Sequence, residues 1–186
     1  MFTLPILARM PSPHLIVVTG ISASGKTTVA RLLAESFPRG AFVEGDLVRE
    51  MVRTGRVDMS PEPSEEALAQ LRLRYRQSAA LADSFHESGF DTVVEDVIIG
   101  EELPGFLAAL RTRPVHLVVL APSPAAVVGR ERDRAKTGYD IWSIEALDAV
   151  LRERTPKLGL WLDTSEMTPD EVVREVLARL PESRLD

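Results

Sequence analysis

Apolar runs and stretches of helical periodicity alternate along this chain. The run at residues 14–20 is unbroken and rich in β-branched side chains, as a strand buried on both faces should be. Comparable apolar runs follow at residues 41–45, 91–98, 116–122 and 159–165. Because helical segments separate these runs, the pattern predicts a parallel sheet with helices on both faces.

The helical segments are expected at residues 26–36, 47–55, 64–88, 101–110, 124–134 and 168–180, with another from about residue 143. Ser64, Ser123 and Thr168 are suitable N-caps, and Gly89 is suited to follow the end of the long helix. With right-handed crossovers between the strands, these elements predict one three-layer α/β domain over residues 1–186 with a five-stranded parallel sheet.

Composition and charge narrow the functional classes. The 186 residues are 45% hydrophobic and 27% charged, which is typical of a globular protein. A formal charge of −6 disfavours nonspecific binding to nucleic-acid phosphates or anionic lipid. The chain has no cysteine, and no apolar run approaches the length of about 18 residues that a membrane span needs. We therefore expect a cytoplasmic protein without a membrane partner, and a nucleic-acid partner becomes a secondary hypothesis.

The most specific motif lies between the first strand and the helix that follows it. Residues 20–27, GISASGKT, match G-x-x-x-x-G-K-[ST] at every fixed position. In this motif the glycines let backbone N–H groups surround phosphate oxygens, the lysine adds a cation, and the hydroxyl binds Mg²⁺. We predict a site for the phosphates of a nucleoside triphosphate with Mg²⁺, in which Lys26 is also catalytic and Thr27 is at the metal. Its residues are Gly20, Ile21, Ser22, Ala23, Ser24, Gly25, Lys26, Thr27 and Thr28.

On this motif and the order of elements around it, the chain resembles the P-loop small-molecule kinases of the nucleoside-monophosphate-kinase-like group. Adenylylsulfate kinase, gluconate kinase and chloramphenicol phosphotransferase are examples. The resemblance covers residues 14–180, and only the phosphate loop is a specific motif within it. It implies a P-loop NTPase fold with a small helical lid and an ATP-dependent kinase. The likeness to chloramphenicol phosphotransferase adds an antibiotic as one class of acceptor.

The resemblance also suggests an acceptor site after the second strand. Residues 44–49, EGDLVR, resemble the D-G-D-N-x-R segment of adenylylsulfate kinases, which places Asp46 at the acceptor hydroxyl. A carboxylate there can take the hydroxyl proton or orient the hydroxyl. Arg49, three residues on, is expected to bind the acceptor. The alternatives are that Asp46 is only an N-cap and that Arg49 is a solvated helix residue.

Two consecutive acids, Glu95 and Asp96, end the third predicted strand. An acid after an apolar strand beside the phosphate loop can hold Mg²⁺ directly or through water. We place Asp96 at the metal and Glu95 at the acceptor, although the sequence leaves open which acid serves which purpose. Both acids could instead be polar loop residues that cap the next helix.

Arginines near residue 130 suggest a lid over the phosphates. Arg130 and Arg134 share a helix face within a lid expected at about residues 130–142, and such side chains can stabilise the transferred phosphate. Arg132, on another face, is a weaker candidate, and a solvated helix of alternating charge is the alternative. Thr164 follows the last strand, where this fold usually runs a loop past the adenine. Backbone groups would read the base there, so side-chain identity does not distinguish ATP from GTP, and an ordinary strand-to-helix loop is the alternative.

Residues 46–88 are expected to wall the acceptor pocket, with Arg76 of the long helix among the residues that reach the substrate. The alternative is a core stripe of leucine and alanine with a solvated arginine face. The function favoured by these observations is transfer of the ATP γ-phosphate to a hydroxyl of a small molecule. A nucleotide-dependent switch and a polynucleotide 5′-hydroxyl kinase are the alternatives, and the oligomeric state is left undetermined.

Overall fold

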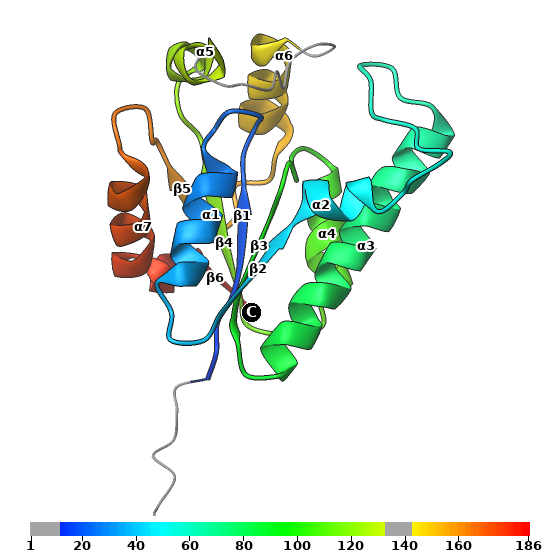
Figure 1. Cartoon of the computed structure of the whole chain (residues 1–186). Coiled ribbons are helices and arrows are strands. Elements are labelled where there is room, and N and C mark those ends of the chain that lie inside the picture. The colour runs from blue at the N-terminus through cyan, green and yellow to red at the C-terminus, as the bar shows by residue number, and fades with distance from the viewer. Residues whose placement is uncertain (1–11, 133–142) are drawn as a thin grey trace, which may run out of the picture.

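The computed structural model describes residues 12–132 and 143–186, which form a twisted parallel sheet between two layers of helices (Figure 1). Its parallel strands, in spatial order, are β2 (Gly40–Glu44), β3 (Asp91–Asp96), β1 (Leu15–Thr19), β4 (Val115–Leu120) and β5 (Leu160–Leu162). The predicted five-stranded parallel sheet is confirmed. A short strand that the sequence did not indicate, β6 (Arg184–Leu185), pairs antiparallel with β4.

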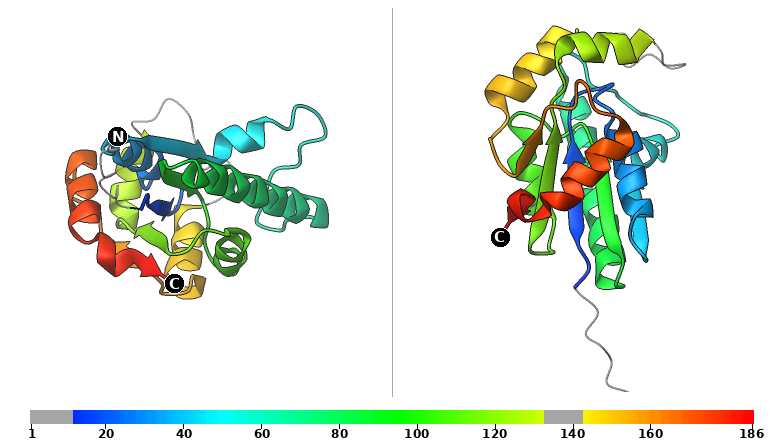
Figure 2. Two further views of the ribbon diagram at one scale, coloured as in Figure 1. Left: turned by 90° about the horizontal axis from the view of Figure 1, so that it is seen from below. Right: turned by 90° about the vertical axis from the view of Figure 1, so that its left-hand side faces the viewer.

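Each face of the sheet has its own hydrophobic core. Ile16 and Val18 of β1 pack with α1 (Lys26–Glu35) and α7 (Pro169–Ala178). The alternate residues Leu15 and Val17 pack with α3 (Glu65–Glu87) and α4 (Glu102–Ala109) on the other face. Figure 2 shows the sheet lying between these two helical layers. Because both faces are covered, the strands are continuously apolar rather than alternating.

Local capping fixes where the helices begin. The Ser64 hydroxyl accepts a hydrogen bond from the backbone N–H of Ala67 at the start of α3. Thr168 and Glu171 form a reciprocal capping box at the start of α7. Gly89, with a φ of +82°, follows the end of α3, in a conformation that favours glycine. These local signals explain why α3 and α7 begin, and why α3 ends, where the sequence predicts.

The remaining elements lie at or near the carboxyl end of the sheet. They are α2 (Gly45–Glu50), α5 (Pro124–Arg132), α6 (Ile144–Ala149) and the π-helix η1 (Val150–Arg154), while η2 (Leu180–Ser183) precedes β6. In Figure 2, α5 and α6 lie above the strand ends. Only residues 130–132 of the expected lid, 130–142, are described. Within the described residues, none of the helices is long and apolar enough to cross a membrane.

Candidate active site

The phosphate loop, residues 20–27, joins β1 to α1 as the motif requires. Gly25 is the N-cap of α1 with a φ of +92°, which glycine adopts without strain. At Gly20 a Cβ atom would come within 2.6 Å of the Leu120 carbonyl oxygen and 2.7 Å of Ser24 Oγ. Ile21 is fully buried and anchors the loop in the core. The glycines are therefore required by conformation and by space.

A cavity of about 300 Å³ lies against the loop and the start of α1. Its walls bring together the following residues that the sequence assigned to the nucleotide: Ala23, Ser24, Gly25, Lys26, Thr27, Thr28, Arg130 and Thr164. The hydroxyls of Ser24 and Thr164 are buried here and have no hydrogen-bond partner in the part of the chain that is described. A buried hydroxyl without a partner is costly, and a bound ligand could satisfy it.

Arg130 ties the phosphate loop to the loop after β5. Its Nη1 donates to the Ser24 carbonyl at 3.0 Å, and its Nη2 donates to the Thr164 carbonyl. The guanidinium thus borders the nucleotide cavity at the level of Gly25. Arg134, expected to act with it, lies outside the described residues.

Thr27 and Glu95 form the side of the loop that could hold a metal. Thr27 Oγ1 donates to Glu95 Oε1 at 3.0 Å, and Glu95 Oε2 is buried with no hydrogen-bond partner among residues 12–132 and 143–186. Burial raises the pKa of Glu95 to about 7, with Asp96 and Glu44 adding to the rise and Lys26 opposing it. Mg²⁺ prefers oxygen ligands and needs few from the protein, so this pair fits the ion.

The Asp96 side chain contacts Arg74 and the Val97 backbone rather than Thr27. Its Oδ2 lies 2.9 Å from Nε of Arg74, and its Oδ1 accepts from the Val97 backbone N–H at 2.7 Å. Burial raises the pKa of Asp96, and the Arg74 cation opposes the rise. A Cβ atom at Gly45 would come within 2.1 Å of Asp96 Oδ2, so α2 begins directly against this carboxylate. The contacts thus favour the reverse of the expected assignment, with Glu95 on the metal side and Asp96 on the acceptor side.

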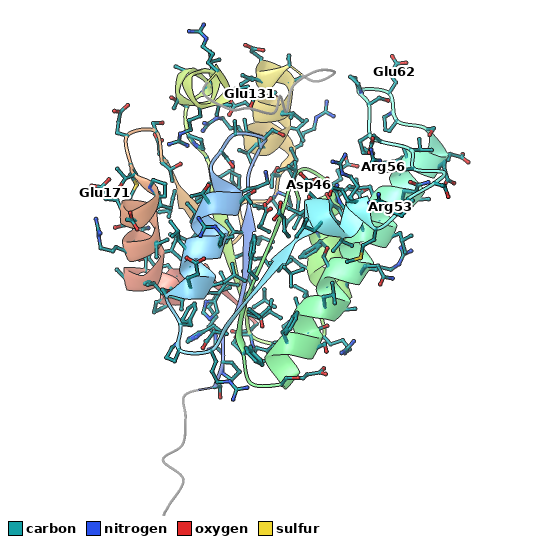
Figure 3. The ribbon with its side chains drawn as sticks, in the orientation of Figure 1. Asp46, Arg53, Arg56, Glu62, Glu131 and Glu171 are labelled. Atoms are coloured by element: carbon teal, nitrogen blue, oxygen red, sulfur yellow. The ribbon has the colours of Figure 1, made fainter. Side chains whose placement is uncertain are left out.

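Asp46 lies in the first turn of α2, where Figure 3 shows it at the carboxyl end of the sheet. The N-cap of α2 is Glu44, so the structure removes the alternative that Asp46 is only a cap. The Asp46 side chain is 57% exposed, and its Oδ1 lies 3.4 Å from Nε of Arg49 and 3.8 Å from Nη1 of Arg74. Arg49 in turn contacts Asp58 at 3.0 Å. Asp46 is therefore an accessible carboxylate held between two cations.

A second cavity, of about 680 Å³, lies between α2, the connector 51–64, α3 and the carboxyl end of the sheet. Ser22 of the phosphate loop, Arg49 and Arg74 all line it. We call it the acceptor cavity, after the acceptor site that the sequence analysis expects here. Arg76, which the sequence analysis placed at the substrate, is exposed and is absent from the described residues that line the cavity.

Arg74 is the residue that the sequence analysis missed. In a helix, residues 71, 74, 75 and 78 share one face, and Leu71, Tyr75 and Ser78 were recognisable as its apolar or small members. An arginine within that stripe must find a buried partner, and Asp96 provides it. Arg76 lies two residues further along and therefore points away from the cavity.

Known proteins resemble this chain in sequence and in structure. A curated protein of Pyrococcus abyssi, provisionally named an adenylate kinase, is 30% identical over 170 residues, which are 88% of this chain and 82% of that protein. The structure resembles that of a sugar kinase from Janibacter sp. HTCC2649, with a TM-score of 0.68, 20% identity and coverage of 92% and 96% of the two chains. It also resembles the APS kinase of Mycobacterium tuberculosis, with a TM-score of 0.65, 19% identity and coverage of 92% and 99%.

At these identities the two structural likenesses concern the fold. The family model described as an AAA domain matches residues 15–157, which include the phosphate loop, the two acids at the end of β3 and Asp46. The chain therefore belongs to the AAA_33 family of AAA domains and has the fold of the P-loop kinases.

Proposed function

We propose that this chain transfers the γ-phosphate of ATP to a hydroxyl group of a small molecule. The observation that carries the proposal is the position of the phosphate loop between two cavities. Residues 23–28 line the smaller cavity, and Ser22 lines the larger one. A nucleotide in the first cavity would present its terminal phosphate toward an acceptor in the second. Two adjoining cavities of this kind suit a transferase better than a nucleotide switch.

The residues suggest how the reaction proceeds. The loop N–H groups and Lys26 bind the phosphates, while Thr27 and Glu95 would hold Mg²⁺. When bound, Mg²⁺ neutralises charge on the β- and γ-phosphates. The acceptor oxygen forms a bond to the γ-phosphorus as the bond between that phosphorus and the β–γ bridging oxygen breaks, and ADP leaves. Asp46 takes the proton that the hydroxyl loses, while Arg49 and Arg74 hold its carboxylate in place.

Replacement of Asp46 by asparagine tests this proposal. Asp46→Asn keeps the size of the side chain but removes its basicity, so phosphoryl transfer should fall by roughly 10²-fold or more. ATP affinity and the melting temperature should stay close to those of the wild type, because Asp46 is exposed. The measurement is the rate of phosphorylated product formation, followed by mass spectrometry, with an acceptor found by screening hydroxyl compounds.

Asp186→Asn is the matched control, since this exposed carboxylate directly follows β6 and, among the described residues, pairs only with Arg184. The screen also includes AMP and 5′-hydroxyl oligonucleotides. Turnover of ATP that needs no acceptor and leaves no phosphorylated product would contradict the kinase proposal. Wild-type transfer by Asp46→Asn would remove Asp46 from the mechanism.

A further inference from the structure

We infer that the acceptor is an uncharged, largely apolar alcohol of roughly drug size. This inference rests on the proposed function, and it names the class of molecule that the acceptor cavity binds. It follows from three properties of the acceptor cavity: its size, the side chains on its walls and the pairing of its charges.

The size and lining of the cavity favour an apolar ligand. Its volume of about 680 Å³ lies within the range of about 300–1,000 Å³ that is typical of sites for drug-sized molecules. Most of the side chains that line it are apolar, and they come from several elements: Val48 of α2, Val57 of the connector, Leu71 and Leu73 of α3, and Leu147 of α6. A sugar, an amino acid or a nucleotide would leave this surface poorly covered.

The arginines on the walls all lie beside carboxylates. Of the arginines that line the cavity, Arg49 lies 3.0 Å from Asp58 and Arg56 lies 3.4 Å from the same carboxylate. Arg74 lies 2.9 Å from Asp96. Every arginine among the described lining residues thus has a carboxylate partner.

An anionic acceptor would have to break one of these pairs or approach their carboxylates. Removal of one partner from a buried pair is costly, and Arg74 and Asp96 are only 14% and 4% exposed. Carboxylates near the incoming anion would also repel it. A neutral alcohol faces neither cost.

The position of Asp46 suggests how such an alcohol would be oriented. Arg74 forms part of the cavity wall, and its Nη1 lies 3.8 Å from Asp46 Oδ1. A hydroxyl that reaches Asp46 would therefore lie beside Arg74 in the cavity wall. Ser22 of the phosphate loop also lines this cavity. The rest of the molecule would extend along the apolar side chains of α3 and the connector.

The experiment measures binding of naphthylethanol, an uncharged fluorescent alcohol, to the full chain with ADP present to fill the nucleotide cavity. Leu73→Asn should weaken binding by about tenfold, because Leu73 lines the cavity. Leu177→Asn is the matched control: both leucines lie on helices, with exposed fractions of 38% and 37%, and Leu177 lies on α7. It should bind naphthylethanol as the wild type does. Equal affinity of Leu73→Asn and the wild type would overturn the inference.

A competition arm tests the charge argument. AMP, adenylylsulfate and gluconate should displace naphthylethanol at least tenfold less effectively than an uncharged aryl alcohol does. Asp58→Asn releases Arg49 and Arg56 from their shared partner, so this variant should gain measurable displacement by AMP. The inference would be overturned if the anions displaced naphthylethanol from the wild-type protein more effectively than the uncharged aryl alcohol does.

The two proposals can fail separately. The binding assay contains no ATP, so a missing phosphorylated product would contradict the kinase activity and leave the ligand class supported by its own measurements. Efficient phosphorylation of AMP or adenylylsulfate, with no displacement by neutral alcohols, would overturn the ligand class and leave a kinase.

Discussion

The environment of the Glu95 carboxylate indicates a binding site for a ligand such as a cation. Its side chain is 3% exposed, one oxygen accepts from Thr27, and the other oxygen has no hydrogen-bond partner within the described part of the chain. Burial is the main reason that its pKa rises to about 7. A cation beside this carboxylate would favour its charged form and satisfy the free oxygen.

Replacement of Glu95 by glutamine distinguishes the affinity that Mg²⁺ adds from the affinity for ATP alone. Glu95→Gln keeps the acceptor for the Thr27 hydroxyl but removes the negative charge, so affinity for ATP without Mg²⁺ should change little. The gain in affinity that Mg²⁺ provides should fall by about tenfold, the equivalent of one charge-assisted contact. Calorimetric titration with ATP, with and without Mg²⁺, gives both values.

Glu101→Gln, at an exposed N-cap without a side-chain hydrogen bond, is the control. If Glu95→Gln and the wild type gain equally from Mg²⁺, Glu95 is not on the metal side of the site.

The α3 helix holds the site through one arginine. Arg74 places its guanidinium 2.9 Å from the buried Asp96 and 3.8 Å from Asp46, and its Cζ lies 5.6 Å from the centre of the Tyr75 ring. Tyr75 itself is fixed by a 2.6 Å hydrogen bond from its hydroxyl to the Val97 carbonyl. The helix thereby fixes the relative positions of the strand-end acid and the proposed base.

Two arginines of α3 form a matched pair for testing this role. Arg74→Met leaves Asp96 buried without its cation and should destabilise the fold by about 2–3 kcal/mol, a fall in melting temperature of about 5–10 °C. Arg76→Met, on the exposed face, should change the stability by less than about 0.5 kcal/mol.

Adding Asp96→Asn to Arg74→Met should recover part of the loss, because the unpaired charge is then removed. Thermal melts of all four proteins measure these effects. Equal melting temperatures for the two arginine variants would show that the Arg74–Asp96 pair contributes nothing to stability.

The sequence predicts α3 and the strands well because their signals are local. A serine cap, a glycine after the last turn and unbroken β-branched runs lie within a few residues of each boundary. The sequence does not predict the features that depend on contacts between residues far apart along the chain. The contacts Thr27–Glu95 and Arg74–Asp96 join residues 68 and 22 positions apart, so no local pattern assigns the two acids. The two-residue β6 likewise forms only because β4 offers it an edge.

Stability of the folded chain also depends on a carboxylate remote from both cavities. Asp83 on α3 is fully buried and accepts hydrogen bonds from the backbone N–H groups of Arg111 at 3.0 Å and Thr112 at 3.0 Å. Burial alone would raise the pKa of Asp83, but these hydrogen bonds, together with the Arg111 cation, outweigh it and lower the pKa. Asp83 therefore joins α3 to the segment that leads into β4.

The lowered pKa fixes the sign of the pH dependence. Because the unfolded chain binds the proton more readily than the folded chain, the contribution of Asp83 is complete above its ordinary pKa of 3.8 and is lost as the pH falls through its lower folded value. Asp83→Asn should lower the free energy of unfolding by about 1–3 kcal/mol at pH 7. The difference from the wild type should shrink between about pH 5 and pH 2.

Urea denaturation at several pH values, with Asp91→Asn at the start of β3 as a comparison whose side chain is 18% exposed, measures the effect. A difference between wild type and Asp83→Asn that is constant over this range would show that the carboxylate charge does not act in the folded state.

The separation of the two cavities by the phosphate loop has a kinetic consequence. Among the described residues the two cavities share no lining residue, and the loop contributes Ser22 to one and residues 23–28 to the other. If the proposed transfer takes place between these cavities, either substrate should bind while the other is absent, and phosphate should pass between them only when both are bound. Initial-rate plots at varied ATP and acceptor should intersect rather than run parallel, and a chiral γ-phosphorus should emerge inverted, because no phosphorylated enzyme intervenes between donor and acceptor.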